Sequence, residues 1–391
     1  MPIKKYDTPL INMSNETNYP YANGIIKHIT VEEWHDLLHH THDGSGNSGS
    51  SIEAKVDAII AALNEAGIEV NIEEPDDGED TTPIEVVSAE EMAAAIENAE
   101  DGDVITIKAD MNTNTGAITF NGKNVTLDLG GKTLSASNSA DGNLTISNGT
   151  VTIDGDGIIT AKDAYDSTHA SNVIKVNNGG ELIINSMNMD TVVGSNTETV
   201  DKGQYGIGVE GNGKLTVNDG TFKAGWFCVN THGVNTANDA EIVINGGTFT
   251  SASDYVIYMA ANTLTTINGG KFTGGAGVLS MNNGRCIIND GEFFVTDEGD
   301  TGTGTDGTTG QANSMCNINA KYGDSYLKIY GGKFTVGGSA PLFKTGTKHI
   351  ADIKIYGGKF SIKPDDIYIA DGYSCSAEAN ADGYFEVKSN W

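Results

Sequence analysis

Arginine, proline and long apolar runs are scarce in this chain. Arg285 is the single arginine among 23 basic residues, whereas 53 acidic residues bring the net charge to -30. Binding to nucleic acid requires lysines and arginines that neutralise phosphates, so this charge balance argues against a nucleic-acid-binding protein. It argues equally against binding to an anionic membrane surface.

Membrane insertion and secretion are not expected either. No apolar run approaches the length that spans a bilayer, and the first ten residues, MPIKKYDTPL, contain two lysines with no apolar stretch behind them. We therefore expect neither membrane insertion nor a secretory signal peptide. The 50 glycines and 7 prolines favour many tight turns over disorder.

The chain has four cysteines, which lie far apart and include no CxxC pair. This spacing is not that of a metal site, and isolated cysteines in strands are most often buried thiols. We predict buried free thiols at Cys228, Cys286, Cys316 and Cys375.

A recurring phrase organises the second half of the chain. Its copies read LTVNDGTF, IVINGGTF, TTINGGKF, CIINDGEF, LKIYGGKF and IKIYGGKF. Most copies return after about 21 to 27 residues, a period typical of a solenoid. Each copy has a glycine at its corner, namely Gly220, Gly247, Gly270, Gly291, Gly332 and Gly358. Two residues later each has an aromatic residue, namely Phe222, Phe249, Phe272, Phe293, Phe334 and Phe360.

Each copy predicts one coil of a parallel β-helix. Alternation as in Ile242–Ile244 indicates a strand with one buried face, and the glycine permits the positive φ of a sharp corner. The phenylalanine then points inward and stacks on its counterparts in neighbouring coils. A second strand follows, as at Val256–Met259. The alternative is an antiparallel sandwich in which each Asn-Gly forms a hairpin turn.

Residues 1–44 are expected to form an N-terminal docking arm with a short helix. The segment is polar and aromatic without periodicity, so it either orders on a partner or is a frayed terminus. The helix begins near Thr30 and ends at HHTHDG. Its histidines, His39, His40 and His42, either bind a metal where chains meet on an axis or form a polar helix end.

Residues 45–72 are predicted to form a short trimeric coiled coil. The apolar residues Ile52, Val56, Ile59 and Leu63 follow the spacing of a coiled-coil seam. β-Branched residues at seam positions favour trimers. The alternative is an amphipathic helix packed on its own chain. Residues 73–83, EEPDDGEDTTP, are expected to be an extended acidic linker.

Residues 84–391 are predicted to form the β-helix shaft. Ser88 and Glu91 have capping-box spacing before a short amphipathic helix, which is expected to cover the first coil. The strand Val104–Ile107 follows. We expect insertions at 186–204 and 297–314, and a C-terminal tail at 373–391 that covers the other end.

Two resemblances follow from these residues. About residues 84–391 resemble the right-handed parallel β-helix domains of the pectate-lyase-like superfamily. The resemblance rests on SAEEMAAAIENAEDGDVITI, on GGKTL after it, and on the repeated ING-G-x-F coils. The arm, the HTHDG element, the coiled coil and the shaft together resemble a bacteriophage virion fibre or spike. The second resemblance implies a homotrimer in the virion, docked through residues 1–44 to capsid or other virion proteins.

The resemblance favours a head (capsid) fibre over a tail spike, because the chain is short and has no recognisable C-terminal trimerisation or chaperone domain.

Lyases of the superfamily use a basic residue beside Ca²⁺-binding carboxylates, but Arg285 has no acidic cluster next to it. Corner residues such as Asp154 and Asp219 are ordinary turn formers. We therefore expect a structural protein with no catalytic residue, cofactor or metal. A tail-spike polysaccharide depolymerase or lyase and a bacterial surface adhesin are the alternatives.

Three aromatic residues are candidates for binding host or environmental glycans. Trp226, Tyr255 and Tyr258 lie on the second strands of consecutive coils. A column of aromatic rings on a sheet face can stack on sugar rings. The alternative is that these rings belong to the core, because Phe227 and Ile257 alternate with them and one set must face inward.

Overall fold

The computed structural model describes residues 83–113, 118–135, 144–161, 172–192, 205–231, 239–252, 254–260, 262–296, 314–318, 325–345 and 352–391. The chain divides into two compact units, Met1–Asp80 and Thr81–Trp391. All described residues belong to the second unit. The docking arm, the histidines near residue 40, the coiled-coil seam and nearly all of the acidic linker lie outside the described residues, so these assignments stay predictions.

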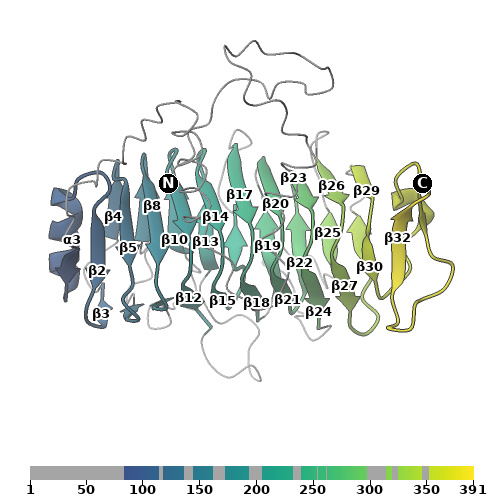
Figure 1. The fold of residues 1–391 in the computed structure, drawn as a ribbon, viewed down its shortest axis with the longest axis horizontal. Coiled ribbons are helices and arrows are strands. Elements are labelled where there is room, and N and C mark those ends of the chain that lie inside the picture. The colour runs from purple at the N-terminus through teal and green to yellow at the C-terminus, as the bar shows by residue number, and fades with distance from the viewer. Residues whose placement is uncertain are drawn as a thin grey trace, which may run out of the picture. The chain divides into compact units, whose positions relative to one another are not determined.

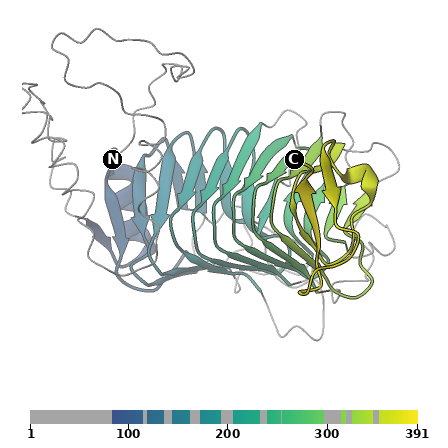
Figure 2. The same cartoon turned by 45° about the vertical axis from the view of Figure 1, so that its right-hand side comes forward.

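The second unit is an all-β structure built from three long sheets, here A, B and C (Figures 1 and 2). Sheet A contains β1 (Ile84–Val86), β2 (Val104–Ile107), β5 (Val125–Asp128), β8 (Thr150–Asp154), β11 (Glu181–Ile184), β14 (Lys214–Val217), β17 (Ala240–Ile244), β20 (Thr263–Ile267), β23 (Arg285–Ile288), β26 (Tyr326–Ile329) and β29 (Asp352–Ile355). Sheet B contains β3 (Met111–Asn112), β6 (Thr133–Ser135), β9 (Ile158–Thr160), β12 (Asn188–Asp190), β15 (Thr221–Ala224), β18 (Thr248–Ser251), β21 (Lys271–Gly274), β24 (Glu292–Val295), β27 (Lys333–Val336), β30 (Gly358–Phe360), β31 (Tyr373–Cys375) and β32 (Phe385–Ser389). Sheet C contains β4 (Ile118–Asn121), β7 (Leu144–Ser147), β10 (Asn172–Asn177), β13 (Tyr205–Val209), β16 (Val229–Asn230), β19 (Tyr255–Met259), β22 (Gly277–Met281), β25 (Cys316–Ile318) and β28 (Phe343–Thr345).

Strand pairing is the pairing expected of stacked coils. The chain visits sheets A, B and C in turn, so the neighbours in each sheet come from successive coils and run parallel. The fold is consistent with a parallel β-helix, and the antiparallel sandwich is wrong. The recurring phrase spans the strand in sheet A, the corner and the strand in sheet B. The second strand of the sequence prediction lies in sheet C.

The interior is a column of phenylalanines flanked by aliphatic side chains. Neighbouring rings in this column have centroids 4.6 to 5.0 Å apart and ring planes 5° to 8° apart. The glycine before each ring is required, as Gly220 illustrates: its φ is 131°, and a Cβ there would lie 2.4 Å from the Met187 carbonyl oxygen. The predicted roles of the phrase in turning and stacking are confirmed. The column comprises Phe222, Phe249, Phe272, Phe293, Phe334 and Phe360.

An asparagine ladder, which the sequence analysis did not predict, runs along the corner between sheets A and B. After the first asparagine of the ladder, the side-chain amide of each one donates a hydrogen bond of 2.7 to 3.0 Å to the Oδ1 atom of the asparagine one coil earlier. Tyr330 and Tyr356 take the same position in the last two coils. The ladder consists of Asn185, Asn218, Asn245, Asn268 and Asn289.

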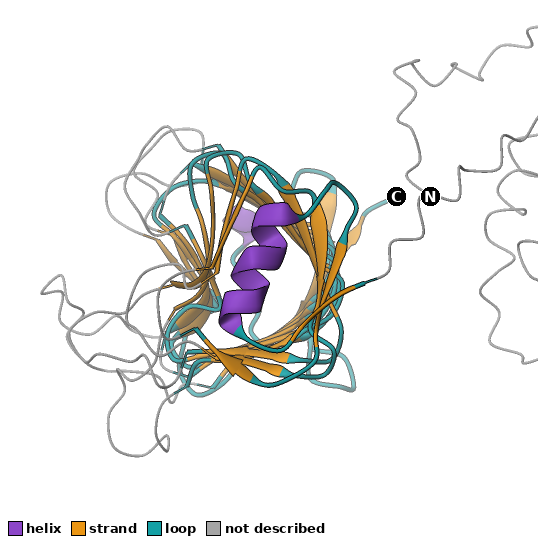
Figure 3. Ribbon diagram, turned by 90° about the vertical axis from the view of Figure 1, so that its left-hand side faces the viewer, coloured by secondary structure: helices purple, strands orange, loops and turns teal. Residues whose placement is uncertain are grey.

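The first coil is covered by the predicted helix, α3 (Ala89–Asn98) (Figure 3). Ser88 is its N-cap, and the Ser88 hydroxyl accepts a hydrogen bond of 3.2 Å from the Glu91 amide. The Glu91 carboxylate accepts from the Val87 amide at 2.9 Å, one residue before the N-cap. Buried Met92 and Ile96 seal the apolar interior beneath the helix.

The C-terminal tail covers the last coil, as predicted. β32 runs antiparallel to β30 and to β31, so the parallel stacking of sheet B ends there. A short 3₁₀ helix, η2 (Asp366–Tyr368), precedes these strands. β32 therefore covers the parallel edge of β30 in sheet B, which would otherwise be open to pairing with another chain.

Two expectations need adjustment. The insertion predicted at 186–204 begins later, because Asn188–Asp190 forms β12 and pairs with β9 and β15. The cysteines are free, as expected. Three of them are buried, and Cys375 is half-buried because it lies in the C-terminal cap.

Candidate functional site

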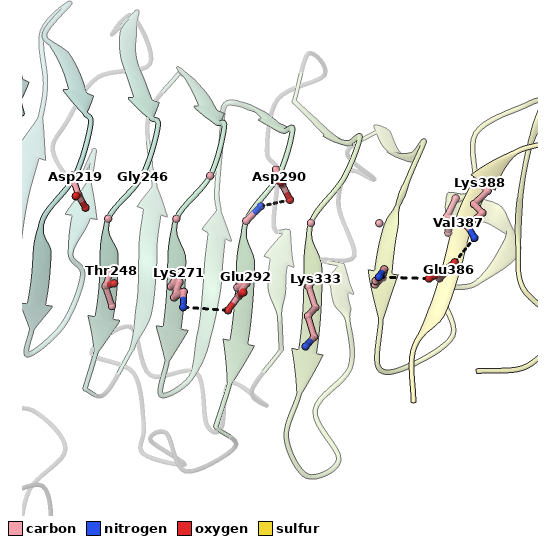
Figure 4. A pocket seen from close by; sticks show the side chains of 17 residues that line it. Asp219, Gly246, Thr248, Lys271, Asp290, Glu292, Lys333, Glu386, Val387 and Lys388 are labelled. Carbon is pink, nitrogen blue, oxygen red and sulfur yellow. Dashed lines mark hydrogen bonds and ion pairs between the residues drawn. The ribbon is translucent and has the colours of Figure 1, made fainter. Parts of the chain in front are cut away.

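An open groove with a volume of about 970 Å³ follows the corner between sheets A and B (Figure 4). The corner glycines form its floor, because they leave no side chain above the backbone. Strand register then places one residue from the first or second position of each sheet B strand, in sheet order from β18 to β32, in a row along the groove. This row reads Thr248, Lys271, Glu292, Lys333, Lys359 and Glu386, with Lys388 beside its end.

Each of the four carboxylates in the groove already has a partner. Asp219 and Asp290 accept hydrogen bonds from the amides of the glycines that follow them, at 2.7 and 2.8 Å. Glu292 lies 3.8 Å from Lys271. Glu386 lies 3.7 Å from Lys359 and also forms an ion pair with Lys388.

The ion pairs of Glu386 set its acidity. The hydrogen bond from Lys388 is the main cause that holds the pKa of this carboxyl below its usual value. A general acid of glycoside hydrolysis needs the opposite, a carboxyl whose pKa is raised. The groove is therefore better suited to binding than to acid catalysis at Glu386.

Arg285, the basic residue considered for a lyase, does not line the groove. It begins β23 in sheet A, in register between Leu264 and Tyr326. Neither register neighbour is a carboxylate of the kind that holds Ca²⁺ in lyases of the pectate-lyase-like superfamily. The position of Arg285 offers no support for lyase chemistry.

The three predicted glycan-binding residues come together in a small aromatic cluster outside the main core. The cluster also contains Tyr205, Phe227 and Ala276. Tyr255 is only 2% exposed, and its hydroxyl lies 3.3 Å from that of Ser314. Burial raises the pKa of Tyr255 to about 12. Tyr255 therefore supports the cluster from within, while Trp226 and Tyr258 are half-buried at its border.

Stacking orders the cluster. Phe227 lies between Tyr205 and Tyr258, with ring centroids 5.4 and 4.6 Å away. Trp226 meets Tyr205 edge-on at 5.8 Å. The buried Nε1 atom of Trp226 has no hydrogen-bond partner in the described part of the chain, and the Tyr258 hydroxyl accepts from Asn282 at 2.7 Å. The rings of this cluster mix stacked and edge-on contacts, so they do not form a regular column like that of the core phenylalanines.

The sequence analysis missed the charged row of the groove. A signal was present: the residue after the corner glycines changes from Thr to Lys and Glu in TF, KF, EF, KF and KF. These positions become one charged row only when the sheet B strands pair in register. Among the described residues, no group of three or more His, Cys, Asp or Glu side chains could hold a metal ion.

No helix among the described residues is both long and apolar enough to cross a bilayer. Comparisons with protein-family models, curated proteins and solved structures found no match for this chain.

Proposed function

We propose that this protein is a structural component of a bacteriophage particle, a homotrimeric head (capsid) fibre. Residues 1–44 dock it to capsid or other virion proteins, and Ile52, Val56, Ile59 and Leu63 hold three chains together. The shaft is a right-handed parallel β-helix of the pectate-lyase-like type. It projects from the virion and binds host or environmental glycans.

The observation that carries this proposal is a shaft of stacked coils covered at both ends. α3 seals the first coil and β31–β32 seal the last one. Such a solenoid is a rigid spacer whose length grows with the number of coils. It also repeats surface groups at the strand spacing of about 4.8 Å, which suits a linear polymer.

Binding without cleavage is favoured over a depolymerase by the groove carboxylates. Two of them accept hydrogen bonds from corner glycine amides, and the other two form ion pairs with lysines. The half-buried rings of Trp226 and Tyr258 offer a second place where a sugar can stack.

Labelling tests the proposal directly. Antibody against the shaft should decorate the heads of purified particles in electron micrographs, and deletion of residues 1–44 should abolish the decoration while the shaft stays folded. Labelled tails, or unlabelled particles, would contradict a head fibre.

Incubation with host capsule should give binding without release of oligosaccharide, whereas release would select the depolymerase.

A further inference from the structure

The last two copies of the recurring phrase differ from the others in their polar residues. Both contain the sequence KIYGGK, at 328–333 and 354–359. Strand register places Lys328 beside Lys354 in sheet A and Lys333 beside Lys359 in sheet B. Like charges directly opposite each other on neighbouring strands lower stability. Two such pairs, one on each side of the same corner, concentrate positive charge there.

Stacked tyrosines lie between the two lysine pairs. The rings of Tyr330 and Tyr356 have centroids 4.6 Å apart and planes 10° apart. Tyr373 of β31 contacts Tyr356 edge-on. On the other side the row continues with Asn289, which is shorter, so no ring of this row covers the second face of Tyr330. Tyr330 is 48% exposed.

Two carboxylates flank this positive charge: Glu386 beside Lys359, and Glu292, the register neighbour of Lys333, which forms its ion pair with Lys271. Lys388 lies beside the Lys333–Lys359 pair at the end of the groove (Figure 4), while Lys328 and Lys354 lie on the sheet A side of the corner, outside the groove. Among the described residues, Glu386 forms ion pairs with two of these five lysines, Lys359 and Lys388. Lys328 and Lys333 lie instead over the rings of Tyr326 and Tyr384, each 4.7 Å from the ring centroid. Five of the 23 basic residues of a chain with net charge -30 are therefore gathered at one end of the shaft.

We propose that this tyrosine–lysine patch binds an acidic linear polysaccharide, with a sugar ring against the free face of Tyr330 and carboxylates at the lysines. The patch consists of Lys328, Tyr330, Lys333, Lys354, Tyr356, Lys359 and Lys388. The proposal rests on the glycan binding proposed above, and it gives that binding a site and a ligand charge. The site is separate from the aromatic cluster of Tyr205 and Trp226.

Three features favour a polysaccharide over a nucleic acid. An aromatic face packs against the apolar face of a sugar ring. The lysines of each pair are about one strand spacing apart, roughly 4.8 Å, which is close to the rise of one sugar in an extended chain. Nucleic acid carries a much higher charge density, about one charge per 1.7 Å of duplex, and would be repelled by the rest of this acidic chain.

Titration calorimetry on the full chain tests the site with two matched probes, carboxymethylcellulose and hydroxyethylcellulose. The first should bind and weaken with added salt, and the uncharged second should bind at least about tenfold more weakly. The double variant K333Q/K359Q should lose about tenfold or more in affinity for carboxymethylcellulose. Its melting temperature should change little, because the substitution removes the repulsion between Lys333 and Lys359 together with the exposed ion pair between Lys359 and Glu386.

The control is K214Q/K223Q, which removes two exposed lysines of β14 and β15 far from the patch. This variant should bind carboxymethylcellulose as the parent does. Equal loss in both double variants would overturn the site, since general charge would then explain binding. If the protein binds hydroxyethylcellulose but not carboxymethylcellulose, the ligand is not acidic, although the proposed glycan binding would still stand. Stronger binding to single-stranded RNA than to carboxymethylcellulose would overturn the ligand class.

Discussion

Thr265 is a polar residue in an apolar column of the core. Its register neighbours in sheet A are Ile242 and Cys286. The side chain is completely buried, and its Oγ1 atom has no hydrogen-bond partner in the described part of the chain. A buried hydroxyl without a partner lowers stability, because water no longer hydrates it.

Thr265→Val should therefore raise the free energy of unfolding by about 1 kcal/mol, since valine has nearly the same shape and no hydroxyl. Urea denaturation measures this as a higher midpoint with an unchanged slope. Thr266→Val, on the opposite and partly exposed face of the same strand, should change stability by less than about 0.5 kcal/mol. A less stable Thr265→Val variant would contradict this assignment.

At the level of elements, the C-terminal cap covers strand edges that could otherwise pair with another chain. β32 covers the edge of β30, and η2 is followed by a bridge from Ile369 to Ile355 of sheet A. An uncovered parallel edge is a template for pairing with another chain.

Deletion of residues 373–391 should therefore cause association that grows with protein concentration, measured by light scattering after gel filtration. Trp391→Ala is the matched control, because this side chain is 94% exposed and its loss leaves β32 in place. The control should keep the oligomeric state of the parent. If the deletion does so too, β31 and β32 are not needed as a cap.

For the whole molecule, the division into Met1–Asp80 and Thr81–Trp391 separates the predicted trimerisation segment from the shaft. The full chain should have the mass of a trimer in light scattering, and a chain that begins at Thr81 should be a monomer with an unchanged circular dichroism spectrum in the β region. A monomeric full chain would contradict the coiled coil. A trimeric shaft would place the contacts in the β-helix.

The elements that could be predicted are those defined by nearby residues. The Ser88–Glu91 spacing located the start of α3, and the alternation around Ile242 and Ile244 located β17. β12 was missed because Met187 and Met189 carry weaker strand signals than the valines and isoleucines of other coils. The asparagine ladder was not predicted because its hydrogen bonds join residues that are 21 to 33 positions apart in the chain.

The sequence by itself determined the coil: the glycine that permits the corner, the phenylalanine that fills the interior, and the helix that seals the first turn. These depend on local geometry and on a repeat that is visible in one dimension. Only the tertiary structure decided which surface residues become neighbours. Lys333 and Lys359 are adjacent because the strands pair in one particular register, and Tyr205 reaches Phe227 because β13 pairs with β16 in a register that places residue 205 opposite residue 227. Loop length varies from coil to coil, so lateral neighbours follow from strand pairing rather than from spacing along the chain.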